Sequence, residues 1–267
     1  MTKTRTGVRN PECYAEALTD CSDKLSREHC LTESVLKAIA LDDEIEVEGL
    51  AWQVAGTSKD VGTKGLASWI LCDRHNSALS GADATALRLF KTIEGILLNF
   101  GEERNEQHHI NGDEFERWML RTLCGFAVAK LLVDPQGEKI VGWKAPLEWL
   151  EIIFEGRRFP PSCGMYLLNT DQGKPVHQSP KLLRLASLTG PDKNIWGLRM
   201  WLFQLEILLI MDTSPCQGFH NVGIYQPKAI SYFDDLKTKA VVFDWQHGAG
   251  GEDFPIRIVK LPDETGS

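Results

Sequence analysis

The chain has 267 residues, of which 43% are hydrophobic and 25% are charged, as in an ordinary folded protein with a sizeable core. The formal net charge is -8 and neither half is basic, which excludes a protein that coats nucleic acid through bulk electrostatic attraction. The longest apolar run, 195–211, contains charged residues and is shorter than the roughly 20 residues that span a bilayer, so we expect no membrane segment.

The chain contains seven cysteines, and its first ten residues lack the apolar stretch of a signal peptide. In a reducing compartment, clustered cysteines bind metal ions instead of pairing as disulfides. We therefore expect a cytoplasmic protein with metal ligands among its cysteines.

The first hundred residues combine a knuckle of cysteines with short helical and extended patterns. A long amphipathic pattern follows, in which apolar residues recur at spacings of three and four. The predicted elements are a helix capped by Thr32 over 33–39, strands at 46–54 and 69–71, a glycine-rich loop at 56–65, and a helix over 79–97.

The rest of the chain begins with a polar stretch, 102–112, that is predicted to be a linker. Asp113 and Glu116 have the spacing of a capping box, which predicts a helix over about 114–132. A short helix is predicted to start at 146–150, and from residue 165 onward short strands alternate with turns.

Helices followed by a run of strands favour an α+β protein with an antiparallel sheet. The predicted organisation is a zinc-binding module over residues 1–100 and an α+β domain of unknown role over residues 112–267.

Four residues in the first part of the chain have the types and the pairing of a tetrahedral zinc site: Cys13, Cys21, Cys72 and His75. Their pattern is C-x7-C followed much later by C-x2-H. Cys30 is a possible substitute ligand. The alternative is that these cysteines are small buried apolar residues, as free cysteines often are.

Glu28 and His29 lie between the two predicted ligand pairs, and Asn76 follows the second pair directly. A carboxylate and an amide can hold Mg²⁺ or Mn²⁺, and an imidazole with a near-neutral pKa can deprotonate a water molecule. The alternative is that Glu28 is a surface charge and His29 a packed core residue.

Asp83 lies on the same helical face as Asn76 and Ser80, where it could assist a cation site. Ser80 and Asp83 also have the spacing of a capping box, and we favour this interpretation.

Together these residues resemble those of the HNH, or ββα-metal, nucleases. The resemblance is to a group of uncharacterised bacterial proteins in which a cysteine-rich knuckle runs into Ser-x-Glu-His, here 26–29, and it covers about residues 11–98. It implies a ββα element flanked by zinc ligands, with Glu28 and Asn76 as ligands of a catalytic cation and His29 as the general base. The implied zinc ligands are Cys13, Cys21, Cys72 and His75.

The chain departs from this family in three ways. Its first ligand pair is widely spaced, His75 replaces the usual cysteine, and the middle Asn that orients the histidine is absent from 66–71, where Ser68 is the only polar side chain. The predicted function is a metal-dependent endonuclease acting on DNA, weakened by the missing Asn. The alternatives are a non-catalytic, zinc-scaffolded protein that binds a partner and a structural protein without metal.

Overall fold

The computed structural model shows a mixed α+β protein, which confirms the fold class that the order of elements predicts. It describes residues 5–100, 105–168, 182–190, 192–203, 205–214, 223–247 and 250–258. Within these ranges, no helix combines the length and the apolar character that crossing a membrane requires.

The five described helices include one near each predicted position and one, α2, that the sequence did not predict. They are α1 (Glu33–Ile39), α2 (Asp73–Ala78), α3 (Ser80–Leu98), α4 (Gly112–Val128) and α5 (Leu147–Glu155), with 3-10 turns η1 (Glu16–Leu18) and η2 (Thr63–Leu66). The strands are β1 (Leu25–His29), β2 (Glu44–Glu48), β3 (Ser58–Gly62), β4 (Ala67–Cys72), β5 (Glu106–Asn111), β6 (Gly164–Leu168), β7 (Leu182–Thr189), β8 (Ile195–Leu202), β9 (Leu205–Ile210), β10 (Gly223–Tyr225), β11 (Ala229–Phe233), β12 (Thr238–Asp244) and β13 (Phe254–Arg257).

The strands form three sheets. A hairpin-like pair joins β1 to β4, a seven-stranded sheet has the order β10-β6-β9-β8-β7-β2-β3, and a four-stranded sheet has the order β13-β11-β12-β5. Most pairs are antiparallel, as predicted, but three pairs are parallel: β2 with β7, β11 with β13, and β12 with β5. The sheets are therefore mixed.

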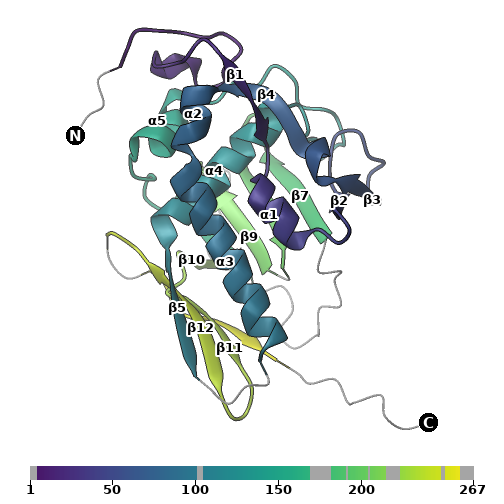
Figure 1. Ribbon diagram of the computed structural model, residues 1–267, viewed down its shortest axis with the longest axis vertical. Helices are drawn as coiled ribbons and strands as arrows, with labels where there is room; N and C mark the ends of the chain where they lie inside the picture. Colours follow the sequence, from purple (N-terminus) through teal and green to yellow (C-terminus); the bar gives the residue numbers. More distant parts are fainter. Residues whose placement is uncertain are drawn as a thin grey trace.

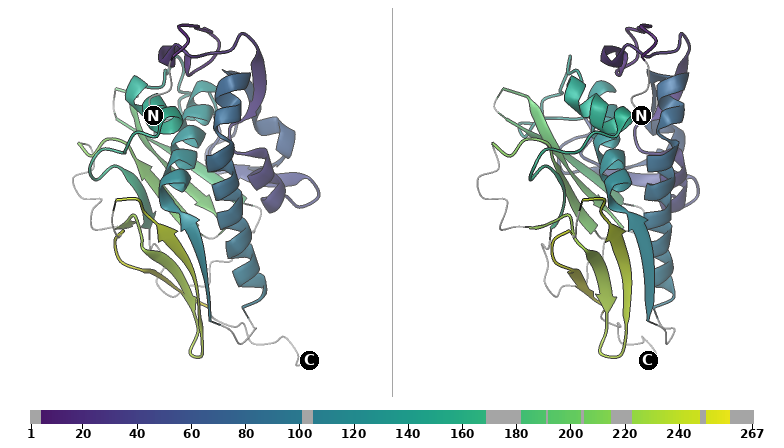
Figure 2. Two further views of the ribbon diagram at one scale, coloured as in Figure 1. Left: turned by 60° about the vertical axis from the view of Figure 1, so that its left-hand side comes forward. Right: turned by 90° about the vertical axis from the view of Figure 1, so that its left-hand side faces the viewer.

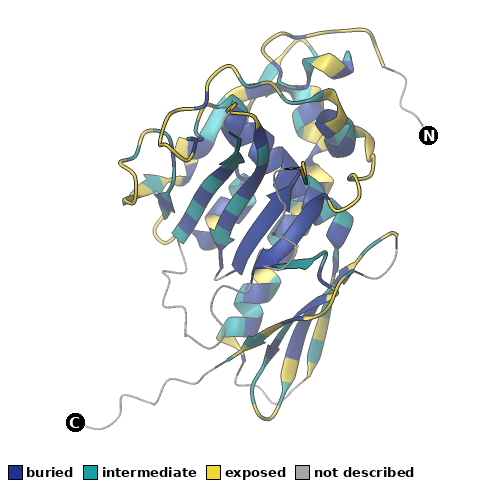
Figure 3. Cartoon of the chain, turned by 180° about the vertical axis from the view of Figure 1, so that it is seen from behind, coloured by how far each residue is buried: buried dark blue, intermediate teal, exposed yellow. Residues whose placement is uncertain are grey.

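The predicted segments 1–100 and 112–267 share one sheet and one core. β2 and β3 belong to the first segment, yet β2 pairs with β7 of the second. Helix α4 lies on the seven-stranded sheet and α3 packs against α4 (Figure 2). Strands β6 and β9 are buried along their whole length (Figure 3).

Long-range pairing creates two strands in segments that the sequence predicted to be a loop and a linker. β3 lies in the predicted glycine-rich loop at 56–65 and pairs with β2, and β5 lies in the predicted linker at 102–112 and pairs with β12. Both segments are polar, and β5 has only one buried residue. Their apolar pattern is therefore too weak to indicate a strand, and the hydrogen bonds of a neighbouring strand make them extended.

Both predicted capping boxes are wrong. The Asn111 side chain caps α4 by accepting a hydrogen bond from the Glu114 N–H at 3.1 Å, and Glu116 points elsewhere. No side chain caps α3, because Leu79 has helical dihedrals (φ −81°, ψ −11°) and α2 runs almost directly into α3 (Figure 1). A nearly continuous helix leaves few N–H groups for a cap to satisfy.

Candidate metal centre and the buried carboxylates beside it

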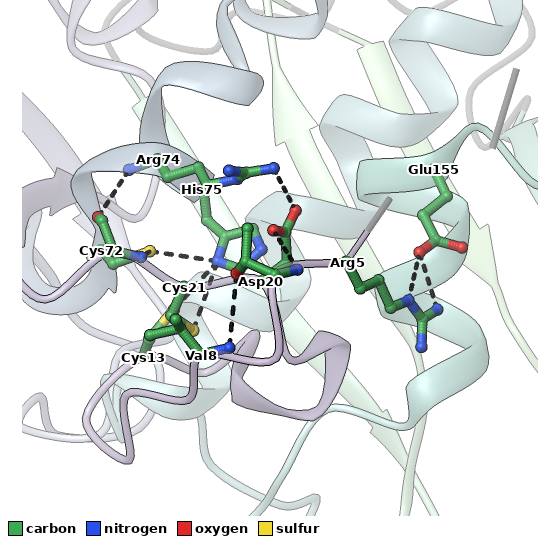
Figure 4. A network of polar contacts seen from close by, with 11 residues as sticks. Arg5, Val8, Cys13, Asp20, Cys21, Cys72, Arg74, His75 and Glu155 are labelled. Atoms are coloured by element: carbon green, nitrogen blue, oxygen red, sulfur yellow. Dashed lines mark hydrogen bonds and ion pairs between the residues drawn. The ribbon is translucent and has the colours of Figure 1, made fainter. Parts of the chain in front are cut away.

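The four predicted metal ligands come together in one buried group. The Nδ1 atom of His75 lies 3.2 Å from Sγ of Cys72, 3.5 Å from Sγ of Cys13 and 3.9 Å from Sγ of Cys21 (Figure 4). All four ligand atoms lie within 4.8 Å of one another. A tetrahedron with ordinary zinc–sulfur and zinc–nitrogen bonds has sulfur–nitrogen edges of roughly 3.6 Å. The group could therefore hold a metal ion.

Local structure explains how two distant ligand pairs meet. The antiparallel ladder pairs Leu25 with Cys72, which brings the end of the N-terminal loop beside the end of β4. Cys72 immediately precedes α2, so His75 lies one helical turn later on the same side. The wide spacing of Cys13 and Cys21 accommodates η1, whose three residues fold the intervening chain into a tight turn.

The pKa values of the cysteine ligands shift in different directions. Burial raises the pKa of the Cys13 thiol. Burial also works against ionisation of Cys72, but N–H groups of His75 and Ser22 point at its sulfur and bring its pKa below the ordinary value. The Ser22 N–H lies 3.4 Å from that sulfur. A cation at the centre would stabilise the remaining thiolates.

Cys30 is not a member of this group. Its buried Sγ donates to the carbonyl oxygen of Gly125 in α4 at 3.5 Å. A Cβ atom at position 125 would come within 3.2 Å of the Cys30 Cα, so glycine permits this close approach. Cys30 is therefore a packing residue, and the alternative of a substitute ligand is wrong.

Glu28 is a buried charge and not a surface one. Glu28 is 6% exposed, and its Oε1 atom forms an ion pair with Nη2 of Arg121 at 2.7 Å. Burial raises the pKa of Glu28 to about 7; Arg121 opposes this shift and Asp83 adds to it. The acid that the resemblance assigns to a cation is thus already paired with a positive group of the chain.

Asp83 shares the same arginine. Its Oδ1 atom lies 3.0 Å from Nη2 of Arg121 and accepts a hydrogen bond from Oγ1 of Thr32 at 2.5 Å. Nε1 of Trp118 in turn donates to Oγ1 of Thr32 at 2.7 Å. Asp83 is therefore a member of a buried network that also contains Glu28.

His29 is half-buried at the end of β1. Burial lowers its pKa below the ordinary value, and Glu33 offsets this only in part. Its Nε2 atom is buried and has no hydrogen-bond partner among the residues that the structure describes.

Asn76 lies on α2, one residue after His75 and beside the metal cluster. Asp83 is seven residues farther along the helix, about 10 Å at 1.5 Å per residue. Glu28 lies three residues from Leu25, which pairs with Cys72, and this is also about 10 Å along the strand. Glu28 and Asp83 meet at the same atom, Nη2 of Arg121. Within the described ranges, Glu28 and Asn76 share no hydrogen bond, and the catalytic roles of Glu28, His29 and Asn76 stay predictions.

Arg121 joins Glu28 and Asp83, and the sequence did not indicate this role. It is 2% exposed, and its Nη1 atom donates to the carbonyl oxygens of His29 at 2.8 Å and Cys30 at 3.0 Å. Its guanidinium group therefore connects α4 to the end of β1. The available signal was its position three residues after Trp118, on the apolar side of the predicted helix.

Glu116 is a second buried carboxylate, at 1% exposure. Its Oε1 atom accepts hydrogen bonds from the Met165 N–H at 2.7 Å and from Nε2 of Gln226 at 3.1 Å. Burial raises its pKa to about 8, although both hydrogen bonds work in the opposite direction. Asp113 also raises this pKa and Arg117 lowers it.

We expect Glu116→Gln to remove part of the pH dependence of folding. The folded chain keeps the Glu116 proton up to about pH 8, whereas the unfolded chain releases it near the ordinary value of 4.5, so wild-type stability should fall as pH rises between these values. The limiting slope for one proton is about 1.4 kcal/mol per pH unit. Denaturant unfolding of the wild type and of Glu116→Gln at pH 5, 6, 7 and 8 measures this change of stability with pH. If the free energy of unfolding changed with pH in the same way in the two proteins, a raised pKa of Glu116 would be contradicted.

Comparison of the chain with protein family models, with curated proteins and with solved structures finds no match. The resemblance to HNH nucleases therefore rests on the residues of the first hundred positions alone.

Proposed function

We propose that this chain is a zinc-stabilised binding protein whose HNH-like element is a scaffold that does not cleave DNA. That element consists of β1, β4 and the helices α2 and α3. The observation that carries the proposal is the guanidinium group of Arg121, which lies between the carboxylates of Glu28 and Asp83.

Zinc is the metal that the ligand set favours. Three thiolates and one imidazole are typical of structural zinc sites, in which four protein ligands leave no open position. All four residues are buried, which also suits a structural ion and not a catalytic one.

Arg121 supplies the positive charge that a catalytic cation would bring to Glu28. Both residues are almost completely buried, so Mg²⁺ or Mn²⁺ would have to displace a guanidinium group from the protein interior. Breaking a buried ion pair by removing one partner costs about 3–5 kcal/mol. A phosphodiester would also need access to a carboxylate that is 6% exposed.

The backbone contact of Arg121 bears on His29 as well. In the family that the sequence resembles, an Asn orients the catalytic histidine, and this chain has no such residue at 66–71. Arg121 instead binds the carbonyl oxygen of His29, which holds the backbone and leaves the ring without an orienting partner in the described structure. A general base that is not oriented loses much of its effect.

The second candidate is the endonuclease itself, and one observation favours it. Burial keeps His29 in its neutral form near pH 7, and its Nε2 atom has no partner within the described ranges, as a general base requires. In that case His29 would take a proton from the attacking water while a cation at Glu28 and Asn76 stabilised the leaving oxygen.

A plasmid assay separates the two candidates. We expect wild-type protein and His29→Ala to leave supercoiled plasmid equally intact in Mg²⁺ or Mn²⁺. His108→Ala, which changes a half-buried histidine on β5, is the matched control. Cation-dependent nicking by the wild type and by His108→Ala, but not by His29→Ala, would replace the proposal with the endonuclease.

A further inference from the structure

A cleft of about 650 Å³ opens beside the first turn of α4, away from the metal cluster. Its walls come from four places in the chain: the first two turns of α4, the segment after α5, the end of β10 and the turn after β12. Small-molecule sites in proteins usually occupy about 300–1,000 Å³. The cleft therefore has the size of a site for one small ligand.

Guanidinium groups gather at this cleft although the chain as a whole is acidic. Gly156 ends α5 in the left-handed conformation (φ 73°), and the chain then continues through Arg157 and Arg158 along the rim. Arg157 pairs with Glu151 at 2.5 Å, on the α5 side. Arg158 is exposed and forms no ion pair with any residue in the described part of the chain, so its donors are available to a ligand.

The acidic residues of the cleft offset little of this charge. Burial raises the pKa of Glu116, which keeps that group largely neutral at pH 7. Asp113 already accepts a hydrogen bond from the Gln246 N–H at 2.9 Å. Arg117 pairs with Glu114 and Arg157 pairs with Glu151, while Arg158 has no ion pair within the described residues, so the cleft keeps an unpaired positive charge that attracts anions.

Aromatic rings line the same cleft and are held in place. The Trp245 ring packs on Gly112, where a Cβ atom would come within 2.6 Å of it, and its Nε1 atom donates to the carbonyl oxygen of Pro227 at 3.0 Å. The hydroxyl group of Tyr225 donates to the carbonyl oxygen of Cys163 at 3.0 Å. The Trp245 ring also stacks on Phe243, with ring centroids 5.8 Å apart, so the rings are fixed in position without a ligand.

One residue that lines the cleft has a constrained backbone. Gln226 has a positive φ of 40°, which is costly for a residue with a side chain. Its N–H donates to Met165 and its carbonyl accepts from Gly251, while its side chain reaches Glu116. Unfavourable backbone conformations that are held in place by the surrounding structure are frequent at ligand sites.

We propose that this cleft binds a small anionic ligand with a planar ring, of the chemical class of a nucleoside monophosphate. The phosphate lies against Arg157 and Arg158, because the planar guanidinium group matches phosphate oxygens in a bidentate manner. The ring lies against Trp245. This inference rests on the proposed function as a binding protein and names its ligand class.

Calorimetric titration of the full-length, zinc-loaded chain tests the inference. The probes are AMP, GMP, CMP and UMP, with adenosine and inorganic phosphate as the separated parts. At least one nucleotide should bind at least tenfold more tightly than either part, because ring and phosphate contacts add. The Arg157→Gln/Arg158→Gln double variant should weaken that binding at least tenfold, while Arg88→Gln, which changes an exposed arginine on α3 outside the cleft, should not.

Three outcomes would overturn the inference: no saturable binding of any nucleotide up to about 1 mM, the weak end of ordinary affinities; phosphate binding as tightly as the nucleotides; or an unchanged affinity in the double variant. Zinc content and plasmid nicking are measured on the same preparation. A folded, zinc-loaded, non-nicking chain that binds no nucleotide refutes the ligand class only, whereas nicking refutes the proposed function.

Discussion

Substitution of Cys72 by Ser should release the metal ion and unfold the region around β1, β4 and α2. The ligands come from an N-terminal loop and from the junction of β4 with α2, so the ion joins segments that are about 50 residues apart in sequence. Structural zinc contributes about 10–16 kcal/mol to the folding of isolated zinc fingers, and a part of this should be lost here because the rest of the core remains. Elemental analysis and denaturant unfolding measure both effects.

Cys30→Ala is the matched control, because Cys30 is equally buried but lies outside the cluster. It should keep one zinc ion per chain and lose on the order of 1 kcal/mol. Wild-type protein without bound metal, or a Cys72→Ser protein as stable as the wild type, would instead support a structural protein that needs no ion.

Arg121→Met should lower the free energy of unfolding by about 3–5 kcal/mol, because it leaves the buried Glu28 and the half-buried Asp83 without their counter-charge. The loss should be smaller at pH 5 than at pH 8. Burial already raises the pKa of Glu28 to about 7, and removal of the guanidinium group raises it further, so the variant relieves the unpaired charge by binding a proton at low pH. Denaturant unfolding at the two pH values measures this.

Arg117→Met is the control on the same helix, one turn earlier. Its partner Glu114 is part-exposed, so its ion pair should contribute at most about 1 kcal/mol. Adding Glu28→Gln to Arg121→Met should recover part of the lost stability, since one unpaired charge disappears. Equal losses in Arg117→Met and Arg121→Met would contradict the central role of Arg121.

The metal ligands could be predicted because their chemistry is nearly independent of context. Thiols and an imidazole at paired spacings are typical of metal ligands, and the predicted set of Cys13, Cys21, Cys72 and His75 is the set that the structure brings together. The described helices other than α2 could also be predicted, because each carries its own apolar periodicity.

The surroundings of Glu28 could not be predicted in the same way. A carboxylate before a histidine looks the same in sequence whether it faces solvent, a cation or an arginine. Arg121 is more than 90 residues away along the chain, and only the packing of α4 against the end of β1 brings it to Glu28. Asp83 has the spacing of a cap, but α2 continues into α3 and leaves no helix end to cap.

Sequence by itself determined the ligand set of the candidate metal centre, the amphipathic helices and the α+β class, since each depends on residue type and short-range spacing. Tertiary structure decided that β3 and β5 are strands, that residues 1–100 contribute two strands to a sheet built mainly by later residues, and that Glu28 is paired with an arginine. The physical reason is the range of the interactions. Ladder hydrogen bonds and buried ion pairs join partners far apart in sequence, and no local pattern records which partner burial will select.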